Sequence, residues 1–137
     1  MTNTLLTGGK AGPNAKMATA FIATLFHGVT KVHMLHIMTK GPQWYPVHVA
    51  LGELYNGLQG LSDGLAESFI GCTGVELAFG SGPFELSLDP LAEVRKMYAF
   101  VEQNRTAMGT ESHIQNEIDT VCTLLASTIY KLTRATA

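Results

Sequence analysis

The chain of 137 residues is short of charge, of cysteine and of long apolar runs, and each shortage excludes a class of protein. Only 15% of its residues are charged and the formal net charge is −2, which is not the balance of a basic nucleic-acid-binding protein. Its cysteines, Cys72 and Cys122, lie far apart and form no C-x-x-C pair, so the sequence predicts buried thiols and neither a disulfide framework nor a zinc site. This cysteine usage favours a reducing, cytoplasmic location.

The sequence also lacks a segment that would cross or enter a membrane. The most apolar run, residues 17–26, is too short for a transmembrane helix and is soon followed by His27, Lys31 and His33. The first 14 residues have neither the charged start nor the apolar stretch of a signal peptide. We therefore expect no membrane partner and one domain over residues 1–137, in which residues 1–13 form a flexible N-terminal segment.

Apolar residues make up 46% of the chain, and in four segments they recur at the spacings of three and four that are typical of helices. The first segment has a plausible N-cap at Asn14, runs to about Thr39 and stops at Lys40-Gly41-Pro42, where proline cannot continue the helix. The second segment has Pro46 in its first turn and ends at the glycines of residues 71–74.

Two more segments follow an irregular stretch. Asp89-Pro90 predicts a capped start for a third helix that runs to about Met108, and Gly109 breaks it. Ser112 with Gln115 forms a capping-box signature for the fourth helix.

The connections between these segments predict the fold class. Residues 73–89 combine glycines and a proline with apolar residues, which favours a long crossover, although residues 75–79 alternatively fit a short strand or helix. The other two links are short. One long crossover among four helices is the connection pattern of ferritin-like bundles. The predicted fold is therefore all-α, a ferritin-like four-helix bundle with one long crossover between helices two and three.

Four polar residues, two at the first bend and two further along the second helix, are candidate metal ligands. His36 and His48 bracket the bend, and Asp63 and Glu67 lie about 60° and 100° around the second helix from His48, outside its leucine stripe. Carboxylates together with imidazoles suit Fe(II). Taken separately, each residue has a simpler explanation: a carboxylate pair four residues apart is usually a solvated face, and a histidine at a helix end usually caps or packs.

Taken together, these residues resemble the Dps mini-ferritins, the DNA-binding proteins from starved cells. In that family a second histidine follows the first by twelve residues, and an aspartate and an Ala-Glu pair follow the second histidine by fifteen and nineteen. All three spacings are met here. The resemblance covers residues 14–134 in helix order, and it is specific over residues 36–74. The residues that define it are His36, Lys40-Gly41, Trp44, His48, Tyr55, Asp63 and Ala66-Glu67.

The resemblance implies a function and a site. In the family, four-helix subunits form a hollow homo-oligomer, usually a dodecamer, with iron sites at two-fold interfaces. The two histidines come from one subunit, so His36 and His48 would face Asp63 and Glu67 of the partner subunit. These four are the expected catalytic and metal-binding residues of a ferroxidase, which oxidises non-haem Fe(II) with peroxide or oxygen, stores the ferric product and protects against oxidative stress.

The chain departs from the family pattern at three places. Four residues after the second histidine the family usually has an aspartate ligand, and this chain has Gly52; the adjacent Glu53 is a candidate ligand but points about 100° away. Ile37-Met38 replaces a usual Trp-Asn pair, and Ser68 replaces a usual arginine. A second hypothesis therefore stays open: a non-enzymatic ferritin-like structural or assembly protein, such as a phage-encoded shell component, with a degenerate metal site.

Charged residues near the chain ends and at the start of the last helix suggest two further expectations. The ends offer few basic residues, Lys10 and Lys16 at one and Lys131 and Arg134 at the other, so we expect DNA binding to be weak or absent. Acidic residues near the start of the fourth helix are candidates for an iron-entry pore, although a helix start that favours negative charge explains the first of them equally well. They are Glu111, Glu117 and Asp119.

Overall fold

Four α-helices make up most of the structure, a computed structural model that describes residues 13–82 and 84–137. They are α1 (Ala15–Met38), α2 (Trp44–Thr73), α3 (Pro90–Asn104) and α4 (Ser112–Ala135), and a 3₁₀ turn, η1 (Arg105–Met108), follows α3. The described residues contain no β-strand, so the all-α prediction is confirmed. No described helix is long and apolar enough to cross a membrane. Lys10 and the predicted flexible segment, except its last residue, lie outside the described residues.

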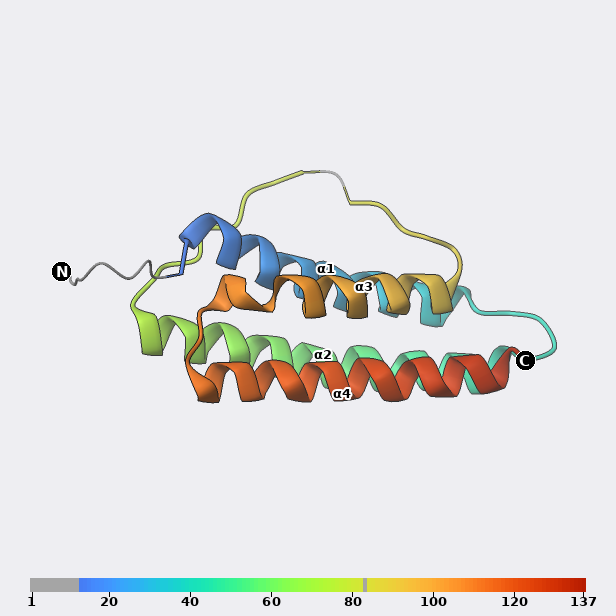
Figure 1. Cartoon of the computed structure of the whole chain (residues 1–137). Helices are drawn as coiled ribbons and strands as arrows, with labels where there is room; N and C mark the ends of the chain where they lie inside the picture. Colours follow the sequence, from blue (N-terminus) through green and yellow to red (C-terminus); the bar gives the residue numbers. More distant parts are fainter. Residues whose placement is uncertain (1–12, 83) are drawn as a thin grey trace.

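The helices are joined by two short links and one long connection (Figure 1). α2 returns antiparallel to α1. Residues 74–89 then run the length of the molecule, so that α3 begins near the end where α2 began and lies parallel to it, and α4 returns antiparallel to α3. The long crossover is confirmed, and the alternative of a short strand or helix at residues 75–79 is wrong, since they have no regular structure.

The four helices enclose an apolar interior. α1 and α4 each pack against both α2 and α3, which closes a ring of contacts around the core. The largest fully buried side chains are Phe21, Phe69, Ile22, Leu25, Leu51, Leu54, Leu58, Leu65, Met108, Ile114, Ile118 and Leu125. Among the described residues only Ser62, Glu93 and Thr128 are polar and buried. Within the described part of the chain, these buried polar residues do not form a set of metal ligands.

Local signals explain two of the helix starts. The Asn14 side chain accepts hydrogen bonds from the backbone N–H groups of Lys16 and Met17, at 2.8 and 3.2 Å. Asp89 accepts from those of Leu91 and Ala92, at 3.1 and 3.3 Å, and Pro90 is the first residue of α3. Each cap satisfies amide groups that have no partner within the helix, so both predicted starts are confirmed.

The start of α2 agrees with prediction and that of α4 does not. α2 begins at Trp44, which places Pro46 in its first turn, as predicted. The capping box at the start of α4 is wrong: Glu111 occupies the N-cap position without a side-chain cap, and Gln115 is engaged elsewhere. Its amide nitrogen donates to the carbonyl oxygens of Arg105 and Gly109, at 2.9 and 2.7 Å. Gln115 therefore ties the preceding turn to α4 and does not cap it.

Candidate functional site

A pair of histidines faces each other where α1 ends and α2 begins. The rings of His36 and His48 stack, with centroids 3.6 Å apart and planes at 17°. Nδ1 of His36 lies 2.7 Å from the carbonyl oxygen of His48, and Nδ1 of His48 lies 2.8 Å from that of His36. Because a carbonyl oxygen only accepts, each Nδ1 must hold the proton and donate it. In the neutral form of each ring the lone pair is then on Nε2, the arrangement in which a histidine is oriented to bind a metal ion.

Gly52 gives this pair its space. A Cβ atom at position 52 would lie 3.0 Å from Cε1 and 3.2 Å from Nδ1 of His36, which is tighter than most Cβ contacts in proteins. To accept a side chain at position 52, the His36 ring would have to shift by a few tenths of an ångström. The space that an aspartate side chain would need at position 52 is therefore filled, in this structure, by the imidazole of His36.

Further rings surround the pair. Tyr55 stacks on His33 with centroids 4.1 Å apart and meets His36 edge-on at 5.3 Å. Trp44 lies 5.4 Å from His48. His36 and His48 are half-buried, whereas Trp44 is 45% exposed. These contacts restrict the rings on one side and leave them on an outward-facing surface of α1 and α2.

The structure does not bring the predicted carboxylates to the histidine pair within one chain. Asp63 and Glu67 are both exposed on α2. Fifteen residues separate Asp63 from His48, which corresponds to about 22 Å along the helix. Glu53 is nearer, but its carboxylate lies 2.9 Å from Nζ of Lys131 on α4, about 140° around α2 from His48. The four residues expected to form one site can therefore meet only between two copies.

Two of the three predicted pore residues have partners within the chain. Glu117 accepts a hydrogen bond from Oγ of Ser68 at 3.1 Å. Asp119 forms an ion pair with Arg105, and this contact is the main reason that the pKa of Arg105 is raised. Glu111 is exposed, at the start of α4.

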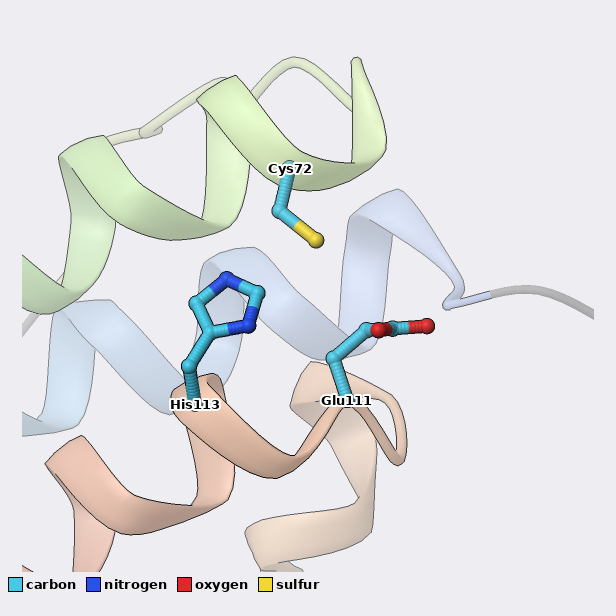
Figure 2. A group of neighbouring side chains, drawn as sticks. All are labelled: Cys72, Glu111 and His113. Atoms are coloured by element: carbon cyan, nitrogen blue, oxygen red, sulfur yellow. The ribbon is translucent and has the colours of Figure 1, made fainter.

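A second group of ligand atoms, absent from the sequence-based hypotheses, lies at the other end of α2. Cys72, Glu111 and His113 each offer one ligand atom, and these atoms lie within 4.8 Å of one another (Figure 2). All three residues are exposed, so the prediction of a buried thiol is wrong for Cys72. No spacing in the sequence marks this group, because α2 and α4 meet there only through their packing.

The other cysteine is half-buried and differs in chemistry. The Cys122 thiol lies 3.2 Å from a carboxylate oxygen of Glu102. Burial first, and then this hydrogen bond, raise the pKa of Cys122 to about 12. Cys122 therefore remains a protonated, poorly nucleophilic thiol at neutral pH.

One protein family matches the sequence, over residues 36–132. It is described as a family of unknown function (DUF5856), and the match covers more than half of the chain. No curated protein and no solved structure matches the chain.

Proposed function

We propose a function for this chain, which belongs to the DUF5856 family of unknown function, from the geometry of its own residues. The protein is a ferritin-like, Dps-like subunit that assembles with copies of itself into a hollow shell, a dodecamer, oxidises Fe(II) at its two-fold interfaces and stores the ferric product. The observation that carries this proposal is the reciprocal pair His36 and His48, in which both Nδ1–H groups are engaged and both Nε2 atoms are left as ligands. Iron is the substrate of this reaction.

The stacked rings indicate how iron would bind. The lone pair of a neutral imidazole lies in the ring plane, and two nearly parallel planes cannot both direct a lone pair at one ion. Each histidine therefore supplies one ligand to one of two neighbouring iron positions.

A second subunit would supply the carboxylates. In a two-fold arrangement of antiparallel α2 helices, His48 of one copy lies opposite Asp63 of the partner subunit, and the reverse holds. A Cβ added at Gly60 or Gly64, beside Asp63 and Glu67, would meet no other part of the chain within 4 Å. Packing within one chain does not require these glycines, and a close approach by a second copy would give them a purpose.

Two adjacent iron positions suit hydrogen peroxide as the oxidant, because it takes up two electrons. Hydrogen peroxide accepts one electron from each of two Fe(II) ions, its O–O bond breaks, and two hydroxide ions and two Fe(III) ions result. Imidazole nitrogens and carboxylate oxygens bind both oxidation states. The protein contributes ligand geometry and holds the two ions close enough to share one oxidant.

One specific observation favours the second candidate, a ferritin-like structural or assembly protein with a degenerate site. Among residues 13–82 and 84–137 no carboxylate contacts His48: the His36 ring fills the space beside Gly52, and Glu53 pairs with Lys131. Iron binding would then depend entirely on the partner's side chains.

Anaerobic Fe(II) titration of the assembled protein, followed by a stoichiometric addition of peroxide, tests the proposal. We expect bound Fe(II) and rapid oxidation in the native protein, and a loss on the order of 10-fold or more in both His36→Ala/His48→Ala and Asp63→Asn/Glu67→Gln. His27→Ala is the matched control, because His27 is exposed on α1 and does not contact the pair. A stable oligomer that binds no iron would contradict the proposal and support the structural alternative.

A further inference from the structure

We propose that Cys72, Glu111 and His113 form a binding site for Zn²⁺ at the opposite end of the bundle from the histidine pair. The three side chains come from the last turn of α2 and the start of α4, and Figure 2 shows them facing the same space. Their ligand atoms lie within 4.8 Å of one another. Twenty-four residues of α2 separate Cys72 from His48, about 36 Å along the helix, so this site is independent of the proposed iron site.

The packing of α2 against α4 holds these residues together. Ser68 donates to Glu117 at 3.1 Å, which fixes the two antiparallel helices relative to each other. One helical turn further, four residues on in α2 and four residues back in α4, brings Cys72 opposite His113. At the far end of the same helix pair, Glu53 and Lys131 form an ion pair at 2.9 Å. The meeting of Cys72 and His113 therefore follows from a register that two separate contacts hold.

The three side chains are available as ligands. Cys72 is a free thiol. Glu111 occupies the N-cap position of α4, yet its carboxylate makes no capping hydrogen bond. Within residues 13–82 and 84–137, none of the three side chains forms a hydrogen bond or an ion pair that would compete with a metal ion. Glutamate is not a usual N-cap residue, so the Glu111 carboxylate is not needed to cap α4 and is free to turn toward a metal ion.

The donor set favours zinc over iron. A thiolate, an imidazole and a carboxylate combine a soft ligand with two borderline or hard ones, and sulfur ligands select Zn²⁺ where carboxylates and imidazoles alone would suit Fe(II). With a thiolate and a carboxylate bound, the charge of Zn²⁺ is neutralised. Three protein ligands leave a fourth tetrahedral position for water.

Small side-chain movements complete the geometry. Zinc–sulfur and zinc–nitrogen bonds of about 2.3 and 2.0 Å place tetrahedral ligand atoms about 3.5 Å apart. The present spacing of up to 4.8 Å closes by rotation of exposed side chains, without movement of either helix. Bound zinc would then fasten the end of α2, immediately before the long connection, to the start of α4.

Cobalt(II) and zinc titrations test this site, with the His36→Ala/His48→Ala protein as background so that imidazoles of the iron site do not contribute. Cobalt bound to a thiolate gives a ligand-to-metal charge-transfer band in the near ultraviolet, which reports on cysteine alone. We expect this band and its displacement by Zn²⁺ in the background protein and in Cys122→Ser, the matched control. Cys72→Ser should abolish the band and weaken zinc binding on the order of 100-fold or more, and His113→Ala should weaken zinc binding similarly.

A second readout is thermal. Zinc should raise the unfolding temperature of the background protein in a concentration-dependent manner, and this increase should disappear in Cys72→Ser. Absence of the cobalt–thiolate band, or zinc binding that Cys72→Ser leaves unchanged, would overturn the zinc proposal. Neither result would affect the iron proposal, because the background protein already lacks the histidine pair.

Discussion

A single residue, Gly52, allows the histidine pair to form. Gly52 lets the His36 ring reach both the carbonyl oxygen of His48 and the face of its ring. Without a side chain at this position, the chain has an ordered imidazole pair beside Gly52 and no carboxylate there.

Gly52→Ala should disturb the pair, and Gly60→Ala provides the comparison. In both variants alanine improves helix propensity by about 1 kcal/mol, and at position 60 the new Cβ meets nothing within 4 Å. At position 52 the ring of His36 must move, which should weaken its hydrogen bond to the carbonyl oxygen of His48. Gly52→Ala should therefore be less stable than Gly60→Ala by about 1 kcal/mol. Urea unfolding measures this difference, and equal stabilities would contradict the proposed role of Gly52.

The two thiols should differ in reactivity. Cys72 is exposed, whereas burial and Glu102 raise the pKa of Cys122 to about 12. We expect iodoacetamide at pH 8 to label Cys72 and to leave Cys122 largely unmodified in the native protein. Because the folded pKa of Cys122 lies above its ordinary value, its thiolate should accumulate only as the pH approaches 12. Peptide mass spectrometry locates the label; Glu102→Gln should speed the labelling of Cys122 by lowering this pKa.

At the scale of elements, one arginine joins α3, η1 and α4. Arg105 donates through Nε to the side-chain oxygen of Gln115 at 2.7 Å and through a terminal nitrogen to the carbonyl oxygen of Gln115 at 3.0 Å. It also pairs with Glu102 and Asp119. The left-handed backbone of Gly109, with φ of 87°, then reverses the chain into α4.

Arg105→Lys should destabilise the protein although it keeps the charge. A lysine cannot reproduce the planar set of donors that reaches Gln115 and Asp119 together, so we expect a loss of about 2 kcal/mol. Arg95→Lys, on an exposed position of α3, should change the free energy of unfolding by less than about 0.5 kcal/mol. Denaturant unfolding of both variants makes the comparison, and similar values for the two would show that Arg105 is not a structural link.

The helices could be predicted from the sequence where their signals are local. Asn14 and Asp89-Pro90 act within the first turn of their own helices, so short sequence windows contain all the information. Gln115 could not be assigned in this way, because its partners belong to the turn before α4. The sequence suggested that Gln115 caps α4, but in the structure its side chain forms tertiary hydrogen bonds instead.

At the scale of the whole molecule, the proposed iron site requires two chains. Mixing His36→Ala/His48→Ala with Asp63→Asn/Glu67→Gln tests this directly, because a mixed two-fold pair has one intact site and one site that lacks all four ligands. After dissociation and random reassembly, about a quarter of the native ferroxidase activity should return. No recovery on mixing would contradict ligands shared between subunits, and control circular dichroism should show both variants folded.

The proposed iron ligands follow from the sequence only with the help of a family resemblance and stay a prediction, whereas the cysteine group could not be predicted from the sequence at all. His36 and His48 are close in sequence, so the bend between them made their meeting predictable. In the proposed site, Asp63 and Glu67 would act with a second copy, which the structure of a single chain does not contain. Cys72 and His113 are brought together by the register of α2 and α4, which depends on side-chain packing along the length of both helices.

The connection of residues 74–89 divides the chain into two helical hairpins, α1 with α2 and α3 with α4. The two helices of each hairpin are near in sequence, so the entropic cost of closing the loop between them is low. Only the docking of one hairpin on the other requires the ends of the long connection to be held together. If the backbone is cut in this connection, the docking of the hairpins becomes a reaction between two molecules that depends on concentration. We therefore expect two fragments cut in this connection to reconstitute the bundle. The first fragment would carry Cys72 and the second Glu111 and His113, so the proposed zinc site would make that reconstitution responsive to zinc.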